Sequence, residues 1–237
     1  MRILKVAVLV TAAVFFGSAG VAAAAPKDYC ADLKGARTAA ACQIQLSDSG
    51  YNVNISFPTD YADQTSVADY ITQTRDAFLN VAKSSAPRDV PYELDITSTN
   101  YSSAIPPRGT QAVVLKTVQN VGTAQPQTTF KAFNWDQSYR KAITYPTAAD
   151  DNKTTPLWRV DDPLKTVVPI VQSELQKQTG QPVNIAPAVA YDPMNYQNFA
   201  VTNDGVIFFF SQGQLLPESA GATQVLVPRS AIDPMLA

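Results

Sequence analysis

One short segment near the C-terminus does most to limit the folds open to this chain. Residues 206–210 read Val-Ile-Phe-Phe-Phe and directly follow Asn203-Asp204-Gly205, a strong signal for a hairpin turn. We therefore predict a β-hairpin over 196–210. Because its second strand is apolar on both faces, that strand must be central in a sheet and covered on both sides.

The N-terminal half shows a second hairpin and a helix. Apolar residues alternate with polar ones over 43–57, interrupted at 48–50, and this pattern predicts a hairpin with its turn at the interruption. Apolar residues then recur at helical spacing over 66–83. Ser66 is the expected N-terminal cap, with Asp69 completing a capping box.

A second helix is predicted over 166–179, ended by Gly180 in a left-handed conformation. A cap at Thr166 places Pro169 in the first turn, where its missing N–H costs nothing. A start at Asp162 would leave Pro169 in the helix interior and force a kink. We favour the start at Thr166.

The remaining segments favour strands and one long loop. Segments rich in β-branched and aromatic residues predict strands at Tyr92–Thr99, Gln111–Gln119, Thr128–Trp135, Tyr139–Tyr145 and Gln224–Val227. The polar stretch 146–163 is the predicted seam between an N-terminal part, 25–148, and a C-terminal part, 149–237. Trp158 in this stretch is interpreted as a buried anchor rather than an exposed binding residue. The expected class is α+β, with two helices packed on mostly antiparallel sheets.

Residues 1–24 have the organisation of a secretory signal peptide. Arg2 and Lys5 precede an apolar run, and small residues follow up to an A-x-A site, so we expect cleavage between Ala24 and Ala25. The apolar run is shorter than the roughly 20 residues that span a bilayer. We expect a secreted, extracellular protein with no integral membrane segment after cleavage.

Cys30 and Cys42 are the only cysteines in the chain. In an oxidising compartment such a pair predicts one disulfide that closes a short loop and ties down the N-terminus. A redox role is less favoured, because the pair lacks C-x-x-C spacing.

The chain contains no histidine, which excludes Ser-His-Asp triads, Cys-His pairs and histidine-ligated zinc. Removing Arg2 and Lys5 with the signal leaves 16 of the 18 basic residues against 20 acidic ones. This mild acidic excess does not favour nucleic acid, and it suits a cationic partner better. We expect no cofactor and no metal.

In a chain without histidine, paired carboxylates are the remaining candidates for catalytic groups. Asp150-Asp151 and Asp161-Asp162 flank the long loop and could serve a glycosidase. Their polar surroundings favour a simpler role in solvating the loop and capping the helix. The sequence also lacks the G-x-S-x-G and H-E-x-x-H motifs. We therefore expect a non-enzymatic protein.

Several segments resemble the mycobacterial secreted immunogenic "protein 64" antigens. They are YQNFAVTNDGVIFFF at 196–210, LLPESAG at 215–221, VLVPRSAI at 225–232, AIPPRGTQAVVLK at 104–116 and FNWDQ at 133–137. The resemblance runs the whole length of the chain, signal included. It implies an exported α/β protein with a β-grasp-like element, and it does not specify a molecular activity.

The C-terminal part is also similar to the extracellular domain of RsiV, an anti-sigma factor that senses lysozyme. Pro217 and Gly221 match that family, whereas Gly213 and Glu218 stand where it has tyrosine. The matching residues shape the backbone, whereas the tyrosines that this chain lacks are bulky side chains that could touch a partner. The similarity therefore implies the fold more than it implies the partner.

We expect a non-enzymatic interaction module whose partner surface lies on loops. The partner is a protein that the sequence does not identify, with a host protein as the candidate, and the chain is expected to be a monomer. A glycan hydrolase without histidine and a passive envelope protein are the alternatives. The candidate contact residues are Ile105, Pro106, Pro107 and Arg108 in loop 101–109, and Leu215, Leu216 and Glu218 in loop 211–221.

Overall fold

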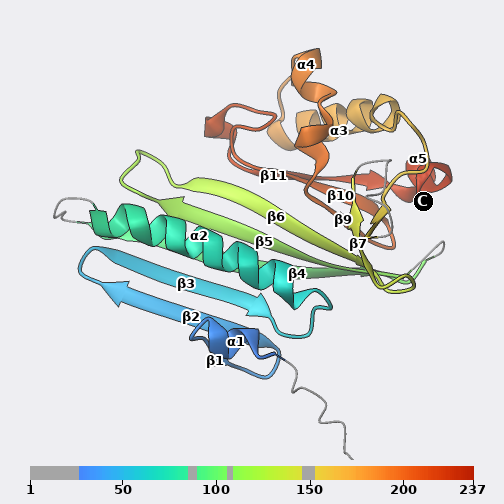
Figure 1. Cartoon of the computed structure of the whole chain (residues 1–237). Helices are drawn as coiled ribbons and strands as arrows, with labels where there is room; N and C mark the ends of the chain where they lie inside the picture. The colour runs from blue at the N-terminus through green and yellow to red at the C-terminus, as the bar shows by residue number, and fades with distance from the viewer. Residues whose placement is uncertain (1–26, 85–89, 106–108, 146–152) are drawn as a thin grey trace, which may run out of the picture.

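The computed structural model describes residues 27–84, 90–105, 109–145 and 153–237 (Figure 1). The large sheet contains β1 (Ala36–Arg37), β2 (Ala41–Asp48), β3 (Tyr51–Pro58), β4 (Tyr92–Ser103), β5 (Thr110–Asn120), β6 (Gln127–Asp136), β7 (Lys141–Thr144) and β8 (Thr154–Pro156). The small sheet contains β9 (Phe199–Val201), β10 (Gly205–Phe210) and β11 (Thr223–Pro228). The helices are α1 (Tyr29–Asp32), α2 (Gln64–Ser84), α3 (Leu164–Thr179), α4 (Pro187–Ala190) and α5 (Arg229–Ile232), with short 3₁₀ turns η1 (Pro193–Tyr196), η2 (Glu218–Ala220) and η3 (Asp233–Met235).

The strands of the large sheet lie side by side in chain order, and most neighbours are antiparallel. The pairs β3–β4 and β7–β8 are parallel. Helix α2 connects β3 to β4, as a crossover between parallel strands requires. The hairpin β2–β3, helix α2 and hairpin β4–β5 form a ββαββ unit with its strands in chain order, and the class is α+β as predicted.

The N-terminal core lies between α2 and one face of the large sheet. Alternate residues of the strands point to this face, so Val53 pairs in register with Leu94 and Ile55 with Ile96. Helix α2 covers them with an apolar stripe that includes Val67, Ile71 and Phe78.

The start of α2 differs from its prediction. The helix begins at Gln64, and the carboxylate of Asp63 accepts hydrogen bonds from Ser66 N at 3.2 Å and Ser66 Oγ at 2.6 Å. The predicted cap at Ser66, paired with Asp69, is therefore wrong. An aspartate one turn earlier satisfies the free amides of the first turn, and the pattern of apolar residues alone does not reveal it.

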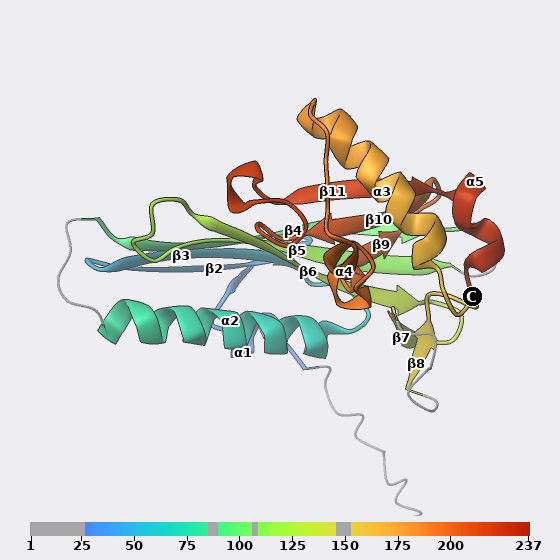
Figure 2. The same ribbon diagram turned by 90° about the horizontal axis from the view of Figure 1, so that it is seen from above.

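Strand β10 is the central strand of the small sheet and is covered on both sides, as predicted. Phe209 faces the large sheet, where its ring centroid lies 5.7 Å from Tyr101 and 5.4 Å from Phe130. Phe208 and Phe210 point the other way, into a core shared with α3. Figure 2 shows the resulting order of layers, α2, large sheet, small sheet and α3.

Helix α3 begins at Leu164, so the predicted start at Thr166 is wrong and Pro169 lies inside the helix. The earlier start lets Leu164 join the buried face of the helix. The N–H that Pro169 lacks would have bonded to the carbonyl of Lys165, and both residues are exposed. Water can therefore satisfy that carbonyl. Gly180 ends the helix in a left-handed conformation, as predicted.

The predicted boundary at 148–149 lies outside the described residues, but strands on both sides of it are described. Strands β7 and β8 pair in parallel, so the sheet continues across the predicted seam. Trp158 is 1% exposed and stacks on Phe208, with ring centroids 6.4 Å apart. The interpretation of Trp158 as a buried anchor is confirmed.

A disulfide joins Cys30 to Cys42, as predicted. It holds α1 against β2, next to the short pairing of β1 with Cys42 and Gln43. Gly35 lies directly on this bridge, since a Cβ there would come within 2.3 Å of Cys42 Sγ.

Candidate functional site

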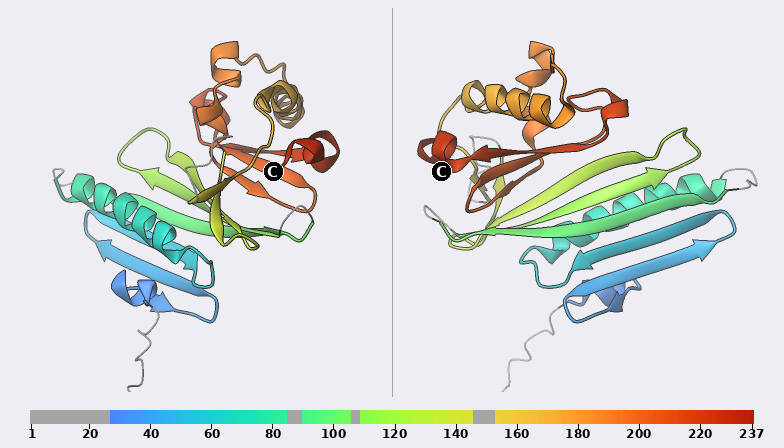
Figure 3. Two further views of the ribbon diagram at one scale, coloured as in Figure 1. Left: turned by 45° about the vertical axis from the view of Figure 1, so that its right-hand side comes forward. Right: turned by 180° about the vertical axis from the view of Figure 1, so that it is seen from behind.

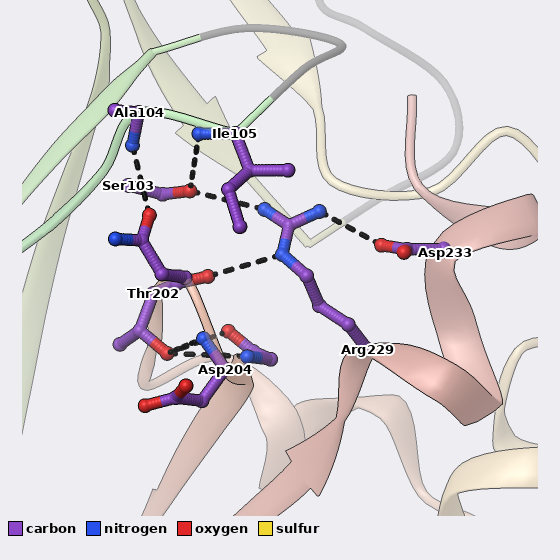
Figure 4. A network of polar contacts seen from close by, with 9 residues as sticks. Ser103, Ala104, Ile105, Thr202, Asp204, Arg229 and Asp233 are labelled. Carbon is purple, nitrogen blue, oxygen red and sulfur yellow. Dashed lines mark hydrogen bonds and ion pairs between the residues drawn. The ribbon is translucent and has the colours of Figure 1, made fainter.

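A network of polar contacts lies where β4, the β9–β10 turn and the C-terminal helices meet (Figure 4). Its centre is Arg229, the first residue of α5, which is only 9% exposed. The guanidinium donates to Ser103 Oγ at 3.0 Å, to the Thr202 carbonyl at 3.3 Å and to Asp233 Oδ1 at 2.7 Å. The backbone N–H of Arg229 donates to the Asp204 carbonyl at 2.9 Å. One side chain thus links three segments that are distant in sequence.

The same network fixes the base of loop 101–109. Ala104 N donates to Asn203 Oδ1 at 3.0 Å, and Ile105 N donates to Ser103 Oγ at 3.3 Å. Ser103 ends β4 and is itself buried. Arginine suits this position because its planar group offers five donors in fixed directions. The backbone is therefore held in place up to Ile105, whose side chain is 38% exposed.

The hollow beside Ile105 is too small to hold a ligand. Ile105, Arg229 and Leu236 help to line a cavity of about 10 Å³. That volume is about the minimum for a single water molecule. The network therefore holds a surface segment in place and does not form a pocket that encloses a substrate.

The chemistry of the network also differs from that of a catalytic centre. Ser103 Oγ accepts hydrogen bonds from a cationic guanidinium and from a backbone amide. A nucleophilic serine needs a neighbouring base to take its proton. Within the part of the chain that the structure describes, no carboxylate or amine bonds to this hydroxyl. No set of three His, Cys, Asp or Glu side chains there is placed to hold a metal ion either.

The two predicted partner loops lie at opposite ends of β10. Residues 101–103 of the first predicted loop belong to β4, and Ala104 after them bonds to Asn203, before β10 begins. Loop 211–221 starts directly after β10 ends. The strand has six residues, which corresponds to a separation of about 20 Å. The structure therefore does not bring the two loops together as one site.

The structure corrects the prediction for Leu215. This side chain is 9% exposed and belongs to the core beneath α3, because the loop folds back over the small sheet. Leu216 is half-buried against the same core. Glu218 is exposed at the start of η2, and its Cγ lies beside Gly213. Of these three residues, Glu218 is therefore the most accessible to a partner.

The remaining predicted residues lie either outside the described part of the chain or on its exposed surface. Pro106, Pro107 and Arg108 lie outside the described residues, and so do Ala24, Ala25 and Asp150-Asp151 with the whole of 1–24. Asp161 and Asp162 are exposed, and Asp162 forms an ion pair with Lys165 at 3.0 Å. The described residues include no helix long and apolar enough to cross a membrane.

Sequence reasoning missed the residues that build the network. Arg229 and Asp233 stand four apart, as a helical ion pair does, but such pairs are usually exposed surface features. Ser103 and Asn203 carry no local signal, since their partners are up to 126 residues away. The only hint in the sequence was Arg229 itself, a lone arginine shortly after the predicted last strand, Gln224–Val227.

A second exposed apolar group was also missed. Helix α4 lies at the top of Figure 1. Val189 on α4, Tyr191 directly after it and Met194 on η1 are exposed, and Met194 is 70% exposed. Their backbone is well held, because Asn195 Nδ2 donates to the Val189 carbonyl at 2.8 Å and Asp192 Oδ1 accepts from Met194 N at 2.9 Å.

The chain is similar to several known proteins. Residues 156–230 match the family described as "Protein of unknown function (DUF3298)". The chain is 65% identical to immunogenic protein MPB64 of Mycobacterium bovis and to immunogenic protein MPT64 of Mycobacterium tuberculosis, with 100% of each chain covered. It is 44% identical to "Esterase Rv3036c" of Mycobacterium tuberculosis over 99% of both chains.

Among solved structures, a DUF3298 family protein of Pseudomonas aeruginosa PAO1 aligns with a TM-score of 0.51 at 11% sequence identity. The alignment covers 83% of this chain and 92% of that one, and it concerns the fold alone. Identity over the full length decides the family. The chain belongs to the family of mycobacterial immunogenic proteins that includes MPB64 and MPT64.

Proposed function

We propose that this protein is a secreted, non-enzymatic interaction module that binds a protein partner, with a host protein as the candidate, through loop 101–109. One observation carries the proposal. Ile105 presents an exposed apolar side chain from a backbone that Arg229, Ser103 and Asn203 hold in place. A contact residue ordered before binding loses little conformational entropy when the partner arrives.

Calorimetric titration of residues 25–237 with lysozyme is the first test. The resemblance to RsiV suggests this probe, and a cationic protein suits the acidic balance of the chain. We expect saturable one-to-one binding that Ile105→Asp weakens. Met194→Asp is the matched control, because it changes another exposed apolar residue on a different element.

The outcomes distinguish a wrong assignment of the contact to loop 101–109 from a wrong assignment of the binding function. Binding lost in Met194→Asp and kept in Ile105→Asp would move the contact to α4 and η1. If lysozyme gives no heat, chemical cross-linking to intact host-cell surfaces is the second probe. Absence of both heat and cross-linked protein would refute the binding function.

Ester hydrolysis is the second candidate, because one full-length relative is named an esterase. The absence of histidine and the cationic surroundings of Ser103 do not favour it. Release of p-nitrophenolate from p-nitrophenyl butyrate tests it directly. Turnover by the native chain that disappears in Ser103→Ala would support an esterase. The exposed positions of Asp161 and Asp162 likewise offer little support for a glycan hydrolase.

A further inference from the structure

Side chains close much of the exposed edge of one strand in this protein, β6, and cover one group on the edge of another, β11. Strand β6 pairs with β7 only at Trp135 and Asp136, so most of its outer edge has no neighbouring strand. Alternate amides on that edge donate to side-chain oxygens instead. The pairs are Thr128 N with Gln212 Oε1 at 3.0 Å, Phe130 N with Ser211 Oγ at 3.1 Å, and Ala132 N with Asn198 Oδ1 at 3.0 Å. On the outer strand β11, the Gln224 carbonyl accepts from Gln178 Nε2 at 2.9 Å.

Strand β2 has an outer edge that is only partly covered (Figure 3). Strand β1 pairs with Cys42 and Gln43 alone, and the disulfide holds this cover in place. The backbone N–H and C=O of one residue point to the same side, and the side alternates along a strand. The Ala41 carbonyl points outward, because it accepts from Thr38 N on the β1 side.

The same alternation makes Gln43, Gln45 and Ser47 point outward. Gln43 lies opposite β1, whereas Gln45 and Ser47 lie beyond its end. None of the hydrogen bonds found among the described residues reaches the backbone groups of Gln45 or Ser47 on this side. Two N–H and two C=O groups are therefore open to pairing.

The usual devices that protect an edge are absent from this window. Natural edge strands carry lysine, proline or a bulge that prevents pairing with another chain. Residues 44–47 are Ile-Gln-Leu-Ser, and the register with β3 is regular throughout. The contrast is with β6, whose outward amides are bonded by side chains, whereas this edge is open.

The two faces beside the window differ in character. Ile44 and Leu46 lie on the face covered by α2, where Leu46 is only partly buried. On the opposite face, Gln45 and Ser47 border a groove of about 380 Å³ lined also by Asn52, Asn54, Glu93 and Asp95. The charged residues on this groove face of β2, β3 and β4 are Glu93 and Asp95, both on β4 and both acidic.

We propose that the outer edge of β2, at residues 44–48, takes an extended segment of the protein partner as an additional strand. The inference rests on the proposed binding function and adds a second contact with the partner, apart from loop 101–109, by strand addition at an open sheet edge. The segment carries an apolar residue beside Leu46 and lysine or arginine on the acidic face. A second copy of this chain is the alternative occupant, and its pairing would depend on the concentration of the protein alone.

Panning the disulfide-intact protein against phage-displayed random peptides tests the mode without knowledge of the natural partner. We expect enriched peptides to alternate apolar and basic residues. Addition of a synthetic enriched peptide should slow hydrogen exchange at the amides of Gln45 and Ser47. Gln45→Pro removes an outward N–H at an edge position that tolerates proline, and should weaken binding about tenfold or more. Gln45→Ala keeps the backbone and should bind like the native chain.

Each contrary result overturns the proposal. Enrichment of no peptide, protection confined to other amides, or equal binding by Gln45→Pro and Gln45→Ala would each do so. Protection of Gln45 that rises with protein concentration alone would identify a second copy as the occupant. Exchange on the native chain decides the matter even if the proline variant fails to fold. Peptides that protect amides beside Ile105 would remove the β2 assignment and leave the binding function standing.

Discussion

Replacing Arg229 by alanine should destabilise the protein by about 3–6 kcal/mol. The guanidinium donates to two acceptors in buried surroundings, Ser103 Oγ and the Thr202 carbonyl. Hydrogen bonds from a charged donor stabilise by about 1.5–3 kcal/mol each. The ion pair with Asp233 adds only about 0–1 kcal/mol, because that carboxylate is half-exposed. Most of the loss should therefore come from the two bonds that hold β4 and the β9–β10 turn together.

Urea denaturation monitored by circular dichroism measures the free energy of unfolding. Asp233→Asn is the matched control and should cost no more than about 1 kcal/mol, since it removes the charge and keeps an acceptor. Hydrogen exchange at Ala104 and Ile105 should accelerate in Arg229→Ala, because the base of their loop is released. A loss as large in Asp233→Asn as in Arg229→Ala would refute the reasoning, since the ion pair would then be the main contribution.

Three further outcomes follow from the packing and the burial of titrating groups. Phe209→Ala should cost about 3–5 kcal/mol in urea denaturation, because this ring fills the contact between the two sheets. Reduction of the Cys30–Cys42 disulfide should lower the free energy of unfolding by about 3 kcal/mol, measured with and without reductant. Burial raises the pKa of Tyr145 and of Tyr196 above the usual 10.0, so their contribution to stability is complete below pH 10.0 and is lost as the pH rises further. Phenolate absorbance of these two residues should therefore appear together with unfolding in an alkaline titration, and ionisation without loss of circular dichroism would contradict this.

Local patterns predicted the elements whose cause is local. The alternation over 43–57, the Asn-Asp-Gly turn and the left-handed Gly180 each act within a few residues, and the structure has the corresponding hairpins and helix end. The start of α3 was mispredicted, since it depends on whether Leu164 finds a core to join and whether Lys165 faces water. Neither condition is visible in the chain order.

The candidate site was predictable only in part for the same reason. Loop 101–109 was identified from its composition, but the network that fixes its base joins Ser103 to Arg229 across 126 residues. Leu215 stands in a loop that was predicted to contact a partner, yet the packing of that loop places its side chain in the core. Whether a side chain is buried depends on which other segments of the fold cover it, and the sequence does not show that directly.

The sequence by itself determined the class of elements, the disulfide and the need to cover β10 on both faces, because hydrophobic periodicity and turn chemistry act between near neighbours. Only the tertiary structure decided which edges are closed. Asn198, Ser211 and Gln212 reach the amides of β6, whereas nothing among the described residues pairs with the outward backbone of Gln45 and Ser47. These contacts form between segments brought together by the packing of one sheet on another, so their existence depends on the whole fold.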